Sequence, residues 1–143
     1  MHTILIAHRD VAFAETLATA LRTGGYFIVT TCPGPWAPER CIRCDTGYCP
    51  ITDGADLMIY DPELTSQDME GHAHNLAVDS ALADPDVPML LAWSPKSTPD
   101  AATLQAIRKR VPRARVAAHE LGALLRQVHS LIGTPPPQLK VLS

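Results

Sequence analysis

The hydrophobic residues of this chain fall into short runs that alternate with polar stretches of helical spacing. Residues 4–7 form an uninterrupted apolar run, which is typical of a strand buried on both faces of a parallel sheet. Asp10 follows as a candidate N-cap for a helix that we expect to reach Thr23, with apolar residues at every fourth position. Gly24-Gly25 is a suitable end for that helix. The pattern therefore predicts a strand followed by a helix.

The same alternation continues along the chain. Apolar or β-branched runs predict further strands at residues 26–31, 56–60, 88–93 and 115–118. Helical spacing predicts helices at residues 69–83, 100–111 and 120–132. The segment 32–54 has no periodicity and contains four prolines, so we expect a loop there. Loops longer than about 15 residues are uncommon in compact domains and are usually functional.

Strands that alternate with helices predict an α/β fold, here a five-stranded parallel sheet between two helical layers. Residues 1–134 would form one domain, with loop 32–54 inserted in place of the second helix, and residues 135–143 a proline-rich tail. Open sheets of this kind bind ligands at the carboxyl ends of their strands. The polar residues predicted to lie at that edge are His8, Arg9, Asp10, Asp61 and Ser94.

Four cysteines lie within the predicted loop, and the chain contains no others: Cys32, Cys41, Cys44 and Cys49. Four thiolates form a complete ligand set for tetrahedral Zn²⁺, and the Cys41–Cys44 spacing suits two ligands from one tight turn. We therefore predict a structural zinc site. An iron–sulfur cluster is an alternative, since Cys49 precedes a proline as in ferredoxins, although the spacings differ. Disulfides or reactive thiols beside Arg40 and Arg43 are a third possibility.

Composition and charge narrow the class of protein. The chain has 143 residues and a net charge of −3, which is not typical of a nucleic-acid-binding protein. Its first residues do not resemble a signal peptide and no run is long enough to cross a membrane, so we expect a cytoplasmic protein. One basic cluster stands out: Arg108, Lys109, Arg110, Arg113 and Arg115. It could bind an acidic partner, or it could be a solvated helix end whose charge suits the helix dipole.

The order of elements and three segments resemble the receiver domain of bacterial response regulators over roughly residues 3–132. The segments are TILIAHRD, ADLMIYDPEL and VPMLLAWS, and Met69-Glu70-Gly71 is similar to the motif that opens the third receiver helix. The resemblance implies a flavodoxin-like fold with Asp61 as phosphoacceptor and Ser94 as switch residue, although Trp93 aligns with the switch position about as well. It also implies an acidic pair and a lysine, yet His8, Arg9 and Ala117 occupy those positions. The chain therefore resembles a degenerate receiver, or pseudo-receiver.

These observations predict a non-catalytic signalling module that acts on a protein partner or as a homodimer, with a zinc-binding loop. An iron–sulfur or thiol-based sensor on the same fold is the alternative. A third possibility is a true receiver in which Asp61 accepts a phosphoryl group, with Arg9 supplying the positive charge in place of the metal. Otherwise Asp61 would be a turn residue before Pro62 or an ion-pair partner of Arg9. His72 and His74 would diverge on the predicted helix and lie at the surface.

Overall fold

A computed structural model of the chain describes residues 2–23, 27–32, 54–67 and 69–133. Several predictions fall outside these residues. They are the glycine pair at the end of the first helix, the loop that holds Cys41, Cys44 and Cys49, and the proline-rich tail. The absence of a helix between the second and third strands is also a prediction about that loop.

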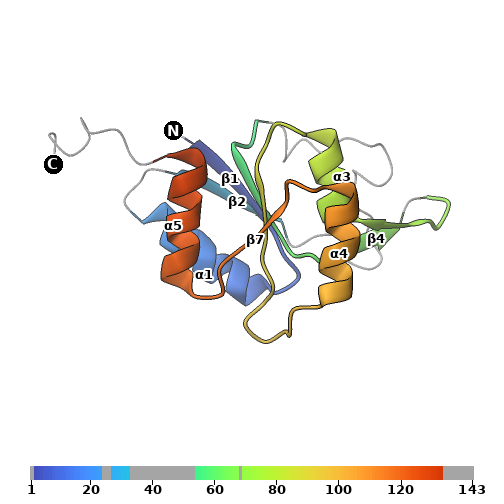
Figure 1. Cartoon of the computed structure of the whole chain (residues 1–143). Helices are drawn as coiled ribbons and strands as arrows, with labels where there is room; N and C mark the ends of the chain where they lie inside the picture. Colours follow the sequence, from blue (N-terminus) through green and yellow to red (C-terminus); the bar gives the residue numbers. More distant parts are fainter. Residues whose placement is uncertain (1, 24–26, 33–53, 68, 134–143) are drawn as a thin grey trace, which may run out of the picture.

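The predicted five-stranded parallel sheet is confirmed (Figure 1). Its strands lie in the order β2-β1-β3-β6-β7. Their bounds are His2–Ala7 for β1, Phe27–Cys32 for β2, Leu57–Tyr60 for β3, Met89–Leu91 for β6 and Arg115–Val116 for β7. Ala7 lies opposite Tyr60, and Tyr60 lies opposite Leu91, so the three central strands end side by side. That alignment creates a shared carboxyl edge.

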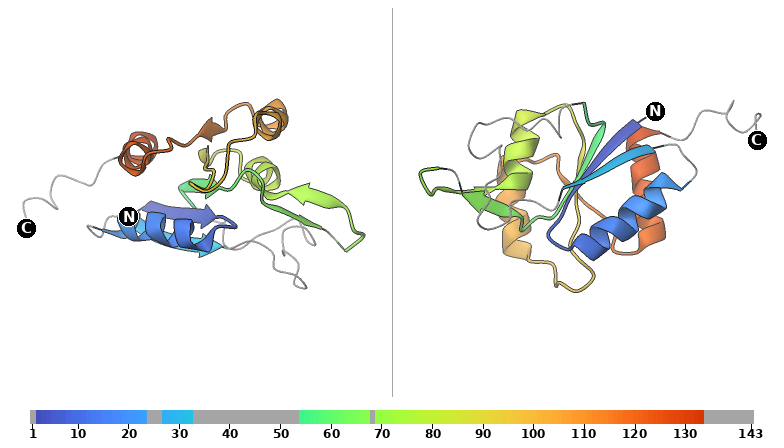
Figure 2. Two further views of the ribbon diagram at one scale, coloured as in Figure 1. Left: turned by 90° about the horizontal axis from the view of Figure 1, so that it is seen from below. Right: turned by 180° about the vertical axis from the view of Figure 1, so that it is seen from behind.

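In the part of the chain that the structure describes, helices cover both faces of the sheet (Figure 2). Helices α1 (Val11–Arg22) and α5 (Leu121–Ile132) lie on one side, and α3 (Leu76–Ala83) and α4 (Ala101–Arg110) lie on the other. Successive side chains of a strand point to opposite faces, which explains the continuous apolar runs. Ile4 and Ile6 join the core beneath α1 and α5, whereas Leu5 and Ala7 join the core beneath α3 and α4.

Acidic side chains begin three of these helices. Asp10, Asp100 and Glu120 each accept hydrogen bonds from backbone N–H groups of the first turn. These groups have no partner within the helix, so a carboxylate stabilises them through hydrogen bonding and charge. Asp10 was predicted as such a cap, and the structure confirms it.

The predicted helix over residues 69–83 is wrong in its first half. Strands β4 (Thr65–Gln67) and β5 (Ala73–Asn75) form an antiparallel hairpin that projects from the domain, and α3 begins only at Leu76 (Figure 1). Gly71 has a φ of 86°, a conformation that favours a turn over a helix. Asn75 then caps α3 by accepting a hydrogen bond from the Val78 N–H.

Two further expectations depended on that helix. The Met69-Glu70-Gly71 motif lies in the turn of the hairpin and does not open α3. His74 belongs to a strand and His72 directly precedes it, so the argument that they diverge on a helix does not apply. Both are nevertheless close to carboxylates, His72 to Glu70 at 3.5 Å and His74 to Asp79 at 2.8 Å.

Candidate functional site

The carboxyl edge of the sheet brings together side chains from three strand ends. The Asp61 N–H donates to the Ala7 carbonyl at 2.8 Å, and the Ala92 N–H donates to the Tyr60 carbonyl at 2.9 Å. His8, Asp61 and Ala92 therefore lie side by side just after the neighbouring strands β1, β3 and β6, although 84 positions of the sequence separate His8 from Ala92. The predicted grouping of polar residues at this edge is present in the structure.

Asp61 is buried, with only 1% of its side chain exposed, and both of its carboxylate oxygens accept hydrogen bonds. The Arg9 Nε donates to Oδ2 at 2.6 Å, and the Arg9 backbone N–H approaches the same oxygen at 3.2 Å. The Glu63 N–H donates to Oδ1 at 3.0 Å. A buried carboxylate needs such partners because it has lost its hydration.

Arg9 binds two carboxylates at once. Its second guanidinium nitrogen, Nη2, lies 3.5 Å from Oδ1 of Asp61 and 3.2 Å from Oε2 of Glu63. The hydrogen bond with Asp61 is the largest influence that raises the pKa of Arg9 above its ordinary value. The guanidinium is half-exposed, so its charge is partly screened by water. The positive charge beside Asp61 therefore comes from a side chain of the protein, Arg9.

His8 is a buried member of the same edge. Its Nδ1 accepts a hydrogen bond from the Asp10 N–H at 3.0 Å, so the ring proton resides on Nε2, which donates to the Ala92 carbonyl at 2.7 Å. The ring also meets Phe13 edge-on at 5.0 Å. These contacts join β1 to the end of β6, in agreement with a structural role for this histidine.

Asp10 and Ser94 form a second polar pair. The Ser94 hydroxyl donates to Asp10 Oδ2 at 2.5 Å and accepts the Lys96 N–H at 3.1 Å. The other Asp10 oxygen accepts the Phe13 N–H at 3.0 Å. The hydrogen bond from Ser94 is the largest influence that lowers the pKa of Asp10, followed by the one from Phe13. The Ser94 hydroxyl thus donates its proton to the hydrogen bond with Asp10.

A cavity of about 200 Å³ lies beside Asp10, between α1 and the segment after β6. Its lining residues are Asp10, Ala12, Phe13, Thr16, Pro95 and Lys96. Neither His8 nor Asp61 contributes to the lining, so a molecule in this cavity would lie next to the Asp10 cap rather than against the buried carboxylate.

Sequence reasoning missed Glu63, which shares the guanidinium of Arg9 with Asp61. The available signal was its position two residues after Asp61, in the same loop. A carboxylate at that spacing can meet a cation from the neighbouring strand end, but the spacing alone does not say that it will.

The predicted metal centre lies mostly outside the described residues. Cys32 is its one described member. It ends β2, is half-buried, and its backbone carbonyl accepts the His8 N–H at 3.1 Å. Over residues 2–23, 27–32, 54–67 and 69–133, no group of three or more histidine, cysteine or acidic side chains is arranged to hold a metal ion.

The basic cluster divides into two parts. The Arg113 guanidinium donates to three carbonyls around the C-terminal end of α3, those of Ala81 at 2.8 Å, Val87 at 2.6 Å and Asp84 at 3.3 Å. Arg108 donates to the Ala114 carbonyl at 3.3 Å. Both arginines therefore hold backbone segments together.

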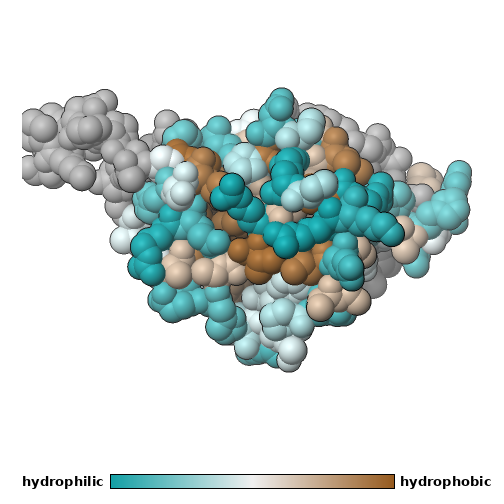
Figure 3. Space-filling model, viewed as in Figure 1, coloured by the Kyte–Doolittle hydropathy of each residue, from teal (hydrophilic) through white to brown (hydrophobic). Residues whose placement is uncertain are grey.

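All five basic residues are exposed, so Lys109, Arg110 and Arg115 differ from the two that hold backbone carbonyls in their contacts and not in their exposure. These three residues belong to α4 and β7, which share one face of the molecule with α5 (Figure 3). Figure 3 shows apolar patches among polar side chains on this face. Val116 and Leu121 are apolar residues of β7 and α5 that are 36% and 37% exposed.

Comparison with known proteins identifies the fold. No protein-family sequence model matches the chain, and no curated protein matches it either. Among solved structures, a CheY-like response regulator receiver domain protein from Methanospirillum hungatei has a TM-score of 0.61 and 12% identity. That match covers 100% of this chain and 99% of the other.

Two more receivers agree. A response regulator receiver domain protein from Clostridium thermocellum matches with a TM-score of 0.60 and 14% identity, over 100% of both chains. The Vibrio cholerae chemotaxis protein CheY4 matches with a TM-score of 0.59 and 12% identity, over 92% of this chain and 98% of its own. The chain therefore has the fold of response-regulator receiver domains. None of the described helices is both long and apolar enough to cross a membrane.

Proposed function

We propose that this chain is a non-catalytic signalling module with a receiver fold, which acts through protein contacts without phosphorylation of Asp61. The ion pair of Arg9 with Asp61 carries the proposal. Attack on a phosphoryl group needs an accessible carboxylate oxygen and a cation that neutralises the transferring group. Asp61 is 1% exposed, and the adjacent guanidinium already binds both Asp61 and Glu63.

The composition of the edge also opposes phosphoryl transfer assisted by a divalent cation. Mg²⁺ is usually held by carboxylates together with phosphate and water oxygens. After β1, His8 and Arg9 stand where the receiver resemblance implies an acidic pair, and Asp10 is bound to Ser94 and to the first turn of α1. The chain's own arginine thus supplies the positive charge at this edge.

Incubation with acetyl phosphate and Mg²⁺, followed by intact-mass measurement, tests the proposal. We expect no phosphoryl adduct, while an active receiver treated in parallel acquires one. An adduct that disappears in Asp61→Ala would instead favour the true receiver. Asp61→Asn, which keeps the shape of the side chain, is the matched variant if the alanine variant does not fold.

We further propose that Cys32, Cys41, Cys44 and Cys49 bind one structural Zn²⁺. The support is their spacing and the placement of Cys32 at the end of β2, from which the chain enters the cysteine-containing segment. Protein purified without oxygen should be colourless and contain one zinc per chain, and Cys44→Ser should lose it. Brown protein that bleaches in air would support the iron–sulfur alternative, and metal-free protein would support the thiol alternative.

Three exposed residues of the basic cluster form our proposed contact surface for a protein partner. Lys109, Arg110 and Arg115 remain after Arg108 and Arg113 are assigned to backbone carbonyls. A two-fold contact centred on them would oppose like charges, so an acidic partner fits better than a second copy. Binding of labelled poly-glutamate should weaken with salt and be lost when all three residues become glutamate. Equal binding by that variant would contradict the assignment.

A further inference from the structure

The cavity beside Asp10 combines apolar walls with two opposite charges. Ala12 and Phe13 line it from α1, and Pro95 lines it from the segment after β6. Asp10 and Lys96 add a carboxylate and an ammonium group to the lining. Sites for small molecules commonly have this composition, because the apolar walls supply binding energy and a few polar groups fix the orientation of the ligand.

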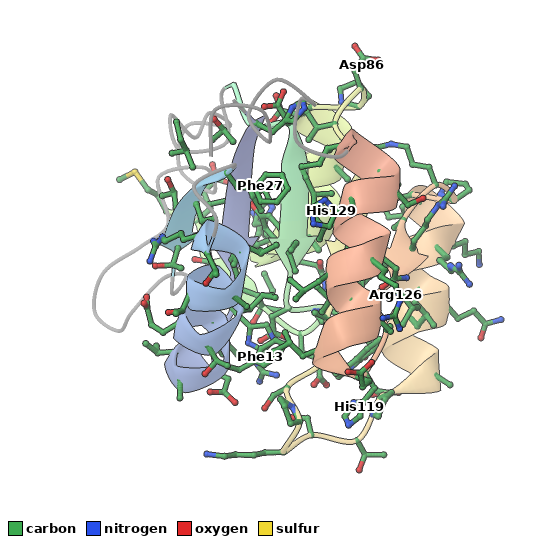
Figure 4. The ribbon with its side chains drawn as sticks, turned by 90° about the vertical axis from the view of Figure 1, so that its left-hand side faces the viewer. Phe13, Phe27, Asp86, His119, Arg126 and His129 are labelled. Carbon is green, nitrogen blue, oxygen red and sulfur yellow. The ribbon has the colours of Figure 1, made fainter. Side chains whose placement is uncertain are left out.

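Hydrogen bonds hold the two sides of this cavity in place. The Ser94 hydroxyl donates to Oδ2 of Asp10 and accepts the N–H of Lys96, so one side chain joins α1 to the opposite wall. Phe13 extends from α1 toward the core (Figure 4), and the ring of His8 meets it edge-on at 5.0 Å. The walls are therefore formed before a ligand arrives, which lowers the cost of ordering them on binding.

The two charged groups can both bind a ligand. Each Asp10 oxygen accepts one hydrogen bond, and a carboxylate has further lone pairs. The pKa of Asp10 is lowered by the Ser94 hydroxyl first, by the Phe13 N–H next and also by the positive charge of Lys96, so the carboxylate is ionised at neutral pH. Lys96 is exposed and takes part in none of the ion pairs between described residues.

We propose that this cavity binds a free α-amino acid with an apolar side chain, whose ammonium group pairs with Asp10 and whose carboxylate pairs with Lys96. A ligand with only a negative charge would be repelled by Asp10, and one with only a positive charge by Lys96, whereas a zwitterion complements both. A cavity of about 150 Å³ holds benzene, so the volume of about 200 Å³ here accommodates the smaller isobutyl group of leucine. The site does not include Asp61 or the proposed contact surface, so its test is independent of both.

Titration with leucine, followed by NMR shifts of the Phe13 and Lys96 backbone amides, tests this inference. The matched probes 4-methylpentanoate and 3-methylbutylamine keep the isobutyl group and lack the ammonium group and the carboxylate, respectively. We expect saturable shifts with leucine and about fivefold weaker binding of either probe, since ion pairs at partly exposed groups contribute little each. Equal affinities for the three compounds would overturn the zwitterion assignment, and no saturable shift with leucine would overturn the site.

Two pairs of variants locate the binding. Lys96→Met should remove the preference for leucine over 3-methylbutylamine, and Lys109→Met, which removes an exposed cation from α4, should keep it. Ala12→Leu fills the cavity from an exposed helical position and should abolish the shifts. Thr19→Leu places the same side chain on the exposed face of α1 outside the cavity and should leave them unchanged. Unaltered leucine affinity in Ala12→Leu would show that the ligand binds elsewhere and would overturn the assignment of this cavity.

Discussion

The carboxyl edge of the sheet and the α4–β7 segment both concentrate charged residues, and the chain uses those charges differently. At the edge, Arg9 and Asp61 come from different strand ends and form an ion pair between a half-exposed guanidinium and a buried carboxylate. In the α4–β7 segment the arginines have no carboxylate partner among the described ion pairs. Arg113 and Arg108 bind backbone carbonyls, whereas Lys109, Arg110 and Arg115 extend into solvent.

The difference shows what decides the role of a charged residue. Asp61 and Arg9 meet because parallel strands align their ends. Arg113 becomes structural because the turn after α4 lies next to the backbone carbonyls at the end of α3. The basic residues of this cluster look equivalent in the sequence. In the folded chain, Arg108 and Arg113 bind backbone carbonyls of neighbouring segments, whereas the other three do not.

Removing the Arg9 guanidinium from the carboxyl edge should lower the free energy of unfolding more than any other change proposed here. Arg9→Met keeps much of the side-chain volume but leaves Asp61 buried without its cation. We expect a loss of about 2 kcal/mol in the free energy of unfolding, less than for a fully buried pair because Arg9 is half-exposed. Urea denaturation of Arg9→Met, Asp61→Asn and the double variant should give a coupling energy of about 1 kcal/mol. Strictly additive losses would mean that the pair does not stabilise the fold.

Arg113→Met should have the next largest effect, because it leaves three carbonyls around the end of α3 without their charged donor. We expect a loss of about 1–2 kcal/mol, since water can replace part of these bonds. Arg110→Met in the exposed last turn of α4 is the matched control, with a change within about 0.5 kcal/mol. Equal losses in thermal denaturation would show that the two parts of the basic cluster do not differ.

Ser94→Ala should cost about 1 kcal/mol, the usual net contribution of one hydrogen bond. The more specific result concerns Asp10, since the Ser94 hydroxyl is the largest influence that lowers its pKa. NMR titration of the Asp10 carboxyl should show the pKa rising toward its ordinary value of 3.8 in the variant. Ser97→Ala in the same loop should leave it unchanged. An unaltered Asp10 pKa in Ser94→Ala would place the origin of the shift elsewhere.

Acid should weaken the helix caps, with the smallest effect of the four. The pKa values of Asp10, Asp100 and Glu120 are lowered by hydrogen bonds, so their stabilisation is present above the ordinary values of 3.8 and 4.5 and is lost as pH falls through the lower folded values. Asp100→Asn keeps a neutral cap and should flatten the fall of stability in that range. Asp86→Asn, an exposed position outside the caps (Figure 4), should not.

Local signals were enough to predict most of the elements. The apolar runs predicted the five strands to within two residues at each end, and the Asp10 cap predicted the start of α1. The hairpin was missed because the segment 65–75 has weak apolar periodicity, and its pairing joins residues on both sides of a glycine turn. The same error placed His72 and His74 on a helix, although His72 is exposed as expected. Short-range patterns do not contain such pairings.

The sequence by itself determined the α/β class, the candidate edge residues and the replacement of the expected acidic pair by His8 and Arg9. These follow from hydrophobic periodicity and from residue identity after each strand, which are local properties of the chain. Only the tertiary structure decided that Glu63 shares the Arg9 charge, that Arg113 holds α3, and that Gln127 covers β7. The Glu63 contact depends on how the strand ends align, and the contacts of Arg113 and Gln127 depend on which backbone groups of other elements come within reach. Both are properties of the assembled fold.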